Sequence, residues 1–142
     1  GKAALWAGAQ DERFAVVIAN SSGRGGASIS RRRFGETVEM VNKCHPHWFC
    51  DNFKKYNANE ETLPVDQHEL LALIAPRPLY LSSNSDNLLN DPEGERIALY
   101  EAMKIYRIYG EPRIGRPVRG GAKDINPDDW TQYLKFAGKY MQ

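Results

Sequence analysis

Apolar and polar positions alternate along this chain in blocks that predict helices and strands in turn. Residues 14–19 form a continuous apolar run of strand length, and residues 78–83 form a second, mostly apolar one. Such runs are typical of parallel strands buried on both faces. Helical spacing of apolar residues predicts helices over residues 2–9, 69–75 and 92–109 and from Pro127 onward. A shorter, weaker strand is expected before the last helix.

The two helices nearest the C-terminus have the clearest periodic pattern. Gly110 is expected to end the first, and Asn126 is a candidate N-cap for the second, with Pro127 in its first turn. Apolar residues of the last helix recur at i, i+3, i+4, i+7 and i+11, which predicts a stripe facing the core. The stripe consists of Trp130, Tyr133, Leu134, Ala137 and Met141.

This order of elements predicts an α/β fold with a parallel sheet flanked by helices. A sheet with so few strands has exposed edges and little core. The pattern is therefore that of one part of a larger sheet. We expect the chain to require a missing N-terminal half or a partner chain that covers it.

Length and charge exclude several classes of function. A chain of 142 residues forms one domain, of which 26% of the residues are charged, and its formal net charge is only +1. Such a balance does not draw the protein toward nucleic acid or a membrane surface. No apolar stretch approaches the roughly 18 residues of a membrane span. We therefore expect neither nucleic acid nor a membrane as a partner.

The sequence predicts no cofactor and no metal. The glycine-rich loop at residues 23–26 lacks the Lys-Ser/Thr pair of a phosphate-binding loop. The two cysteines can pair or stay free, and with the three histidines they lack the spacing of a zinc site. These residues are Cys44, Cys50, His45, His47 and His68. We expect the segment at residues 47–49 to be a structural plug under the glycine-rich loop.

Short motifs in a fixed order connect the chain to a known family. They are Gly1-Lys2 before an alanine-rich helix, Ser22-Gly23-Arg24-Gly25-Gly26, His47-Trp48-Phe49, Ala72-Leu73-Ile74-Ala75-Pro76-Arg77-Pro78 and Asp91-Pro92-Glu93-Gly94-Glu95. Together they resemble the glucuronoyl esterases, carbohydrate esterase family 15 of the α/β-hydrolases. The resemblance spans essentially all 142 residues. It implies that residues 1–142 are the C-terminal portion of a three-layer α/β-hydrolase sandwich, beginning just after the nucleophile elbow.

The resemblance places the family's catalytic residues where this chain departs from the pattern. The family elbow, Gly-x-Ser-Arg-x-Gly-Lys, ends at Gly1-Lys2, so its serine and arginine would precede the chain. The family's acid has two locations, which correspond to Ser21 and Asn87; Asp86 is an alternative acid one residue away. The family's histidine corresponds to Lys123. A lysine with the ordinary pKa of about 10.4 is protonated at pH 7 and cannot accept the serine proton.

Two positions that hold the sugar in this family are retained. Lys2 matches the lysine that contacts uronic-acid hydroxyls, and Glu36 matches the polar residue that helps to hold the same ring. Taken without the resemblance, Lys2 is a solvated lysine at a helix start. Glu36 is then a carboxylate favoured by the dipole at a helix N-terminus. Both interpretations of each residue remain open in the sequence.

The resemblance implies a serine-type carbohydrate esterase that cleaves esters between glucuronic acid on xylan and lignin alcohols, as in plant cell wall degradation. Because the catalytic positions differ, we expect a fragment or degenerate member that is inactive as this chain. The alternative is a non-catalytic carbohydrate-binding or structural remnant of the fold. A third hypothesis is an active complex with a chain that supplies the serine and arginine. The family suggests a secreted or periplasmic protein.

Overall fold

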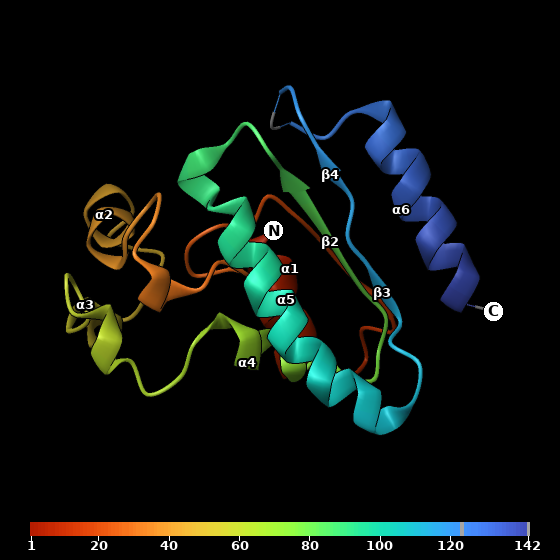
Figure 1. Cartoon of the computed structure of the whole chain (residues 1–142), viewed down its shortest axis with the longest axis horizontal. Coiled ribbons are helices and arrows are strands. Elements are labelled where there is room, and N and C mark those ends of the chain that lie inside the picture. The colour runs from red at the N-terminus through yellow and green to blue at the C-terminus, as the bar shows by residue number, and fades with distance from the viewer. Residues whose placement is uncertain (123, 142) are drawn as a thin grey trace.

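A parallel sheet forms the centre of the computed structural model, which describes residues 1–122 and 124–141 (Figure 1). Strand β1 (Val17–Asn20) lies parallel to β2 (Leu79–Asn84). On its other side β2 pairs in parallel with β3 (Ile114–Gly115) and, farther along, with β4 (Val118–Arg119). The register of the first pair joins Val17 to Leu79, Ile18 to Tyr80, Ala19 to Leu81 and Asn20 to Ser82. The predicted pair of neighbouring parallel strands is confirmed.

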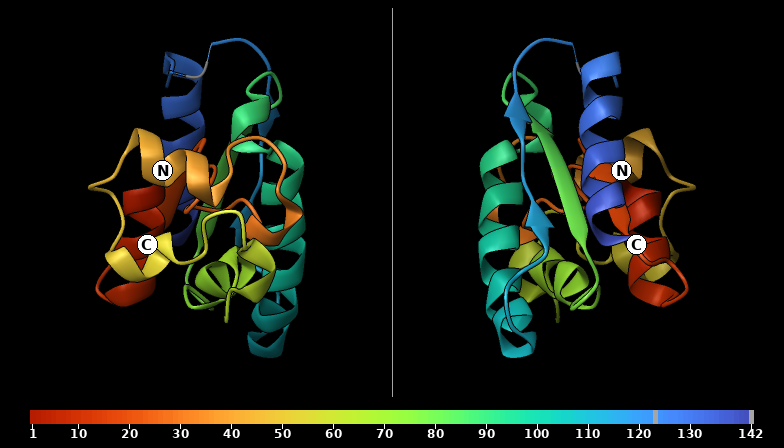
Figure 2. Two further views of the ribbon diagram at one scale, coloured as in Figure 1. Left: turned by 90° about the vertical axis from the view of Figure 1, so that its left-hand side faces the viewer. Right: turned by 90° about the vertical axis from the view of Figure 1, so that its right-hand side faces the viewer.

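Helices cover both faces of this sheet. Helices α1 (Lys2–Gln10), α4 (Gln67–Ala72) and α5 (Pro92–Tyr106) pack on one face, and α6 (Pro127–Tyr140) lies on the other. Figure 2 shows β2 between α5 and α6. Helix α5 continues into a 3₁₀ turn at Arg107–Tyr109, so the predicted helix over residues 92–109 is confirmed in extent. The α/β class and the layered arrangement are also confirmed.

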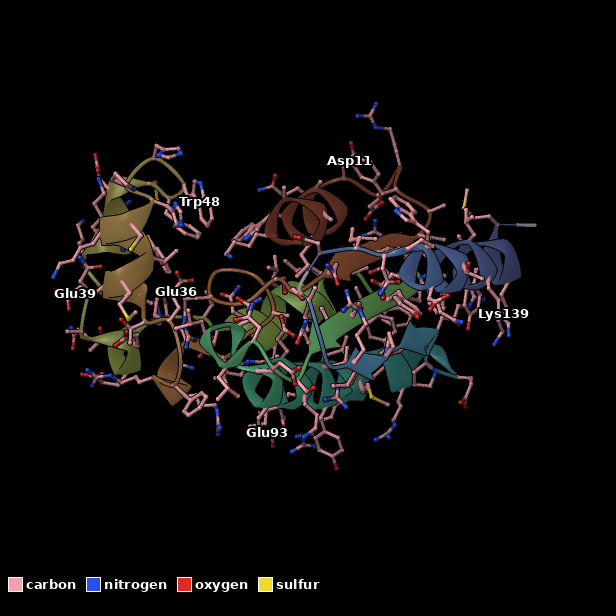
Figure 3. The ribbon with its side chains drawn as sticks, turned by 90° about the horizontal axis from the view of Figure 1, so that it is seen from above. Asp11, Glu36, Glu39, Trp48, Glu93 and Lys139 are labelled. Carbon is pink, nitrogen blue, oxygen red and sulfur yellow. The ribbon has the colours of Figure 1, made fainter. Side chains whose placement is uncertain are left out.

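A long excursion separates β1 from α4 and projects to one side of the sheet. It contains α2 (Val38–Cys44) and α3 (Asp51–Lys54), with 3₁₀ turns at Ser30–Arg32 and Glu60–Thr62. Figure 3 shows Glu36 and Trp48 on the part of this excursion nearer the sheet, whereas Glu39 lies farther out. The excursion therefore forms one wall beside the end of the sheet.

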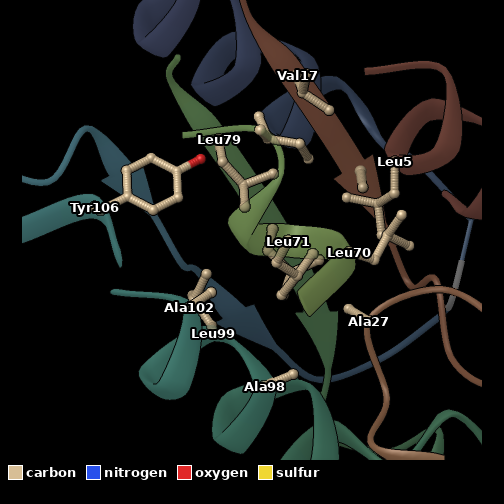
Figure 4. Packing of buried hydrophobic residues seen from close by; sticks show 13 residues of the cluster. Leu5, Val17, Ala27, Leu70, Leu71, Leu79, Ala98, Leu99, Ala102 and Tyr106 are labelled. Carbon is tan, nitrogen blue, oxygen red and sulfur yellow. The ribbon is translucent and has the colours of Figure 1, made fainter. Parts of the chain in front are cut away.

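The main core lies between the sheet and the face covered by α1, α4 and α5. Alternate residues of the strands point into this core (Figure 4). Tyr80 points to the opposite face, where it packs against Tyr133 of α6. The buried apolar residues of this cluster are Leu5, Val17, Ala19, Ala27, Leu70, Leu71, Ile74, Leu79, Leu81, Ala98, Leu99, Ala102 and Tyr106. Gly8 brings α1 close to β1, because a Cβ there would lie 2.3 Å from Val17 Cγ2.

The first strand is shorter than predicted. Its hydrogen-bonded part begins at Val17, and the side chain of Phe14 is 48% exposed. The guanidinium of Arg77 donates hydrogen bonds to the carbonyl oxygens of Asp11 and Phe14, at 3.0 and 3.1 Å. Because the Arg77 side chain occupies these carbonyl oxygens, the hydrogen-bonded ladder of the sheet begins only at Val17.

The expected core stripe of the last helix is wrong. Of its five residues only Tyr133 is buried, while Trp130 and Leu134 are 56% and 69% exposed. The helix contacts the sheet through Tyr133 and Phe136, whose rings pack on Tyr80 at centroid distances of 5.4 and 4.9 Å. The sheet beneath is too narrow to cover the rest of the stripe. The predicted cap is confirmed, since Asn126 and Asp129 form a reciprocal capping box.

The glycine-rich loop after β1 is organised around a buried arginine. Arg24 is 1% exposed. It donates to the carbonyl oxygens of Glu36 at 2.7 Å and Phe34 at 3.0 Å, and to those of Ser28 and Ile29. One side chain thus satisfies four main-chain acceptors that no helix or strand satisfies. It fixes the path that leads to Glu36.

Replacing Arg24 with methionine should destabilise the protein by at least about 3 kcal/mol, because several buried carbonyls lose their donor at about 1–3 kcal/mol each. Urea unfolding followed by circular dichroism measures the change. Arg13→Met is the matched control, since Arg13 pairs with Asp11 at the surface and its loss should leave the unfolding midpoint unchanged. Equal midpoints for Arg24→Met and wild type would contradict this role.

Candidate functional site

The candidate site is a cleft of about 500 Å³ at the ends of β1 and β2. Open α/β sheets place their sites at the carboxyl ends of the strands, because the loops that leave the sheet meet there. The cleft is lined by Lys2, Glu36, His45, Trp48, Asn84, Asp86, Asn87, Leu89, Asn90 and Gly121. Four residues singled out in the sequence, Lys2, Glu36, Asp86 and Asn87, therefore line one cleft. Lys123 lies outside the described residues.

Lys2 enters the cleft from the first turn of α1. Its Nζ lies 5.0 Å from the centroid of the Trp48 ring, within the range of a cation–π interaction. Trp48 is in turn stacked on His45, with ring centroids 3.7 Å apart and planes within 6°. Burial lowers the pKa of the Lys2 ammonium, while the charges of Glu36 and Glu95 oppose that change. The ammonium is thus held at one place, partly removed from water.

Glu36 is held in the cleft by its main chain. Its N–H donates to the carbonyl oxygen of Leu89 at 2.9 Å, and its carbonyl oxygen accepts from Arg24 Nε at 2.7 Å. It precedes Thr37, which is the N-cap of α2. Glu36 therefore lies before the helix rather than in its first turn, and it lines the cleft with Lys2.

The Asp86 carboxylate is directed toward the loop that precedes Lys123. Its Oδ2 accepts from Gly121 N at 2.7 Å, and its Oδ1 accepts from Ser85 Oγ at 3.1 Å. These hydrogen bonds, the one from Gly121 first, lower the pKa of Asp86, so it is ionised at neutral pH. Asn84 supports the same arrangement, because its side chain donates to the Gly121 carbonyl and accepts from Asp86 N.

Asn87 and Ser21, which the resemblance assigns to the two positions of the family's acid, lie in separate hollows of the structure. Asn87 is half-buried and lines the cleft. Ser21 has a left-handed backbone (φ 44°) and lines a neighbouring hollow of about 740 Å³, shared with Gly1, Trp6 and Phe49. Its hydroxyl is buried and has no hydrogen-bond partner among the described residues. Neither side chain carries a charge.

Sequence reasoning missed the role of Trp48. The interpretation of residues 47–49 as a plug holds for Phe49, whose ring lies against Gly25: a Cβ on that glycine would be 2.3 Å from it. It is wrong for Trp48, which is 47% exposed and lines both the cleft and the neighbouring hollow. Alternation along an irregular segment of three residues carries no signal that separates the two rings.

Within the described part of the chain no group of three His, Cys, Asp or Glu side chains is placed to hold a metal ion. Cys44 and Cys50 are both free and exposed. Among the described residues, no helix is long and apolar enough to cross a membrane.

Comparison with known proteins connects this chain to one enzyme family. A family model described as glucuronyl esterase of fungi matches residues 1–110. The carbohydrate esterase MZ0003, from an unknown prokaryotic organism, is 46% identical over 99% of this chain. A 4-O-methyl-glucuronoyl methylesterase of Phanerochaete carnosa is 39% identical over 96% of it.

Solved structures agree. A promiscuous esterase of carbohydrate esterase family 15 from a marine bacterial metagenome superposes with a TM-score of 0.94, at 44% identity over 99% of this chain. The glucuronoyl esterase of Solibacter usitatus gives 0.92 at 41% identity, also over 99%. The chain spans 36% and 37% of the two curated relatives and 39% and 40% of the two solved chains. It therefore corresponds to little more than a third of their length.

Proposed function

The chain belongs to the glucuronoyl esterase family, and we propose that it supplies the uronic-acid-binding wall and the acid loop of a serine-type hydrolase of 4-O-methyl-glucuronoyl esters. One observation carries the proposal: Lys2, Glu36 and the Asp86–Asn87 loop line a single cleft at the carboxyl ends of parallel strands. In this proposal residues 1–142 are the portion of the hydrolase domain that follows the nucleophile elbow.

The chemistry of the two sugar-binding residues suits a uronate ring. An ammonium has three donors and no acceptor, and a carboxylate only accepts, so together they match hydroxyl groups that do both. Lys2 brings a positive charge to the cleft from α1, and Glu36 brings a negative charge from the excursion. Such charged hydrogen bonds contribute about 1.5–3 kcal/mol each.

The acid loop is suited to support a base. In ester hydrolysis by a serine, an imidazole takes the serine proton and returns it to the leaving alcohol, and a carboxylate stabilises the imidazolium. Asp86 is ionised and already hydrogen-bonded to the Gly121 main chain, two residues before the family's histidine position. A lysine at that position, with the ordinary pKa of about 10.4, is protonated at pH 7 and cannot act as the base.

A second candidate is a carbohydrate-binding module without catalysis. It is favoured by the retention of Lys2 and Glu36 in a chain that has lysine and asparagine at positions of the family's histidine and acid. Both candidates require that the cleft bind a uronic-acid ring, so binding is tested first.

We expect the chain to bind methyl 4-O-methyl-glucopyranuronate, with Lys2→Met and Glu36→Gln each weakening the affinity roughly 10- to 100-fold through loss of a charged hydrogen bond. Titration followed by ¹H–¹⁵N NMR gives the affinity and shows which amides respond. Lys43→Met is the matched control, because Lys43 pairs with Glu39 on the exposed side of α2. If Lys2→Met binds as well as wild type, the cleft is not the uronate site.

A further inference from the structure

Glu95 is a completely buried carboxylate that the proposed chemistry does not use. It lies in the first turn of α5 and is 0% exposed. No basic side chain forms an ion pair with it among the described residues. Burying a carboxylate without a cation is costly unless hydrogen bonds replace the lost water, so its partners explain why it is there.

Three donors from two other elements converge on this carboxylate. Its Oε1 accepts from Ser22 Oγ at 3.0 Å and from Gly23 N at 2.9 Å. Its Oε2 accepts from Ser83 Oγ at 2.6 Å. Glu95 thereby joins α5 to the carboxyl end of β2 and to the turn that follows β1.

The donors that point at Oε1 require an acceptor there, and together with the short contact at Oε2 they favour the ionised carboxylate. Ser22 Oγ accepts from Ala27 N at 3.0 Å, so its own proton is available for Glu95. A main-chain N–H such as that of Gly23 can only donate. The 2.6 Å contact to Ser83 is in the range of O–H···O⁻ hydrogen bonds. Burial raises the pKa of Glu95, and the hydrogen bonds from Ser83, Gly23 and Ser22 offset part of that rise.

The turn at residues 21–23, which Glu95 holds in place, packs directly against Gly1, the N-cap of α1. Gly1 approaches it so closely that a Cβ there would lie 2.9 Å from Ser22 Cα and 2.4 Å from the Asn20 carbonyl oxygen. Lys2 follows directly and extends into the cleft. The charged groups that face Glu95 are the Gly1 amino group and Lys2 on α1, and Arg116 between β3 and β4.

We propose that Glu95 is a positioning residue of the cleft: its carboxylate fixes the Ser21–Gly23 turn beneath α1 and keeps a negative charge below the Lys2 ammonium. The role of the cleft in uronate binding rests on the proposed function, whereas the effect on Lys2 does not. The charge of Glu95 raises the pKa of Lys2 against the effect of burial. Glu36 acts on the Lys2 pKa in the same direction.

Glu95→Gln tests this, because glutamine keeps the shape and the Oε1 acceptor and removes the charge. Its NH2 group takes the place of Oε2 and can donate to Ser83 Oγ, which donates to Oε2 in the wild type. The Lys2 Cε–H signal, assigned by its absence in Lys2→Met, is followed by NMR from pH 7 to pH 11 without ligand. We expect Lys2 to titrate at a lower pH in Glu95→Gln than in wild type. Glu93→Gln is the matched control, since Glu93 lies in the same helical turn but is exposed and paired with Arg96; it should leave the titration unchanged.

The same titration in wild type keeps the proposal testable if Glu95→Gln does not fold. When the Glu95 Cδ signal reports protonation on acidification, the Lys2 Cε–H signal should shift in the same step, because the two groups are coupled. An unchanged Lys2 titration in a folded Glu95→Gln, or no shared step in wild type, overturns the proposal.

Binding of methyl glucuronoside, a ligand stable to base, distinguishes a failure of the proposed function from a failure of the role of Glu95. Lys2 binds in its charged form, so affinity falls as pH rises through the Lys2 pKa, and in Glu95→Gln that fall should begin at a lower pH. If Lys2 shifts as expected but neither protein binds the glycoside, the proposed function fails and the role of Glu95 stands.

Discussion

The 142-residue chain is expected to hydrolyse a benzyl glucuronate ester no faster than buffer does. Enzymes accelerate such reactions at least about 10⁶-fold, so the difference from an active relative will be unmistakable. The resemblance predicts that the serine of the family elbow precedes Gly1 and that Lys123 stands at the position of the histidine. Release of benzyl alcohol measured by chromatography, with the Solibacter usitatus esterase as positive control, gives the rate.

The hydroxyls that the structure describes at this end of the sheet offer no substitute nucleophile. Those of Ser22 and Ser83 are buried and donate to Glu95. In the described part of the chain no serine hydroxyl is hydrogen-bonded to a histidine, as an activated serine would be. Hydrolysis above the buffer rate that is abolished by a serine-directed phosphonate would show that the nucleophile has been mislocated.

The sheet could be predicted because its signal is local. A run such as Phe14 to Ala19 is apolar at every position, has the length of a strand and is rich in β-branched residues, which together favour a strand over a helix. Where the ladder begins was not predictable in the same way. It depends on Arg77, more than sixty residues away in sequence, which takes the carbonyls of Asp11 and Phe14.

The spacing of apolar residues predicts the last helix correctly, but it does not predict how much of that helix is buried. Spacing gives the face on which Trp130 and Leu134 lie, and it cannot give the area of sheet available to cover them. For Glu95 the sequence predicts exposure, whereas the structure shows burial. A glutamate in a helical first turn is ordinarily solvated, so only the convergence of Ser22 and Ser83 reveals a buried one.

The family resemblance singled out residues that line one cleft, and the geometry favours one of the candidate acids. The resemblance predicts Ser21 and Asn87 at the family's acid positions, but Asp86 is the ionised group that accepts a hydrogen bond from Gly121 in the loop ahead of Lys123. A one-residue offset in a loop is beyond what motif spacing resolves. The selection of Asp86 leads to the prediction with the largest expected gain.

In a chimera that joins the N-terminal portion of the Solibacter usitatus esterase to this chain, Lys123→His should raise kcat/KM at least about 10³-fold. The new imidazole supplies the missing base, and Asp86 supplies the charge that stabilises it. Asp86→Asn in the Lys123→His chimera should then remove most of the gain, since loss of such a carboxylate can cost about 10⁴ in rate. Asp51→Asn, which alters an exposed carboxylate of α3 paired with Lys54, is the control and should have no effect.

Adding Asn87→Asp to Lys123→His tests the other acid position, and we expect it to add little while Asp86 is present. Activity that requires Asn87→Asp would assign the acid to position 87 instead. A folded chimera that gains nothing from Lys123→His, with or without Asn87→Asp, would mean that the final loop does not carry the family's histidine position at residue 123.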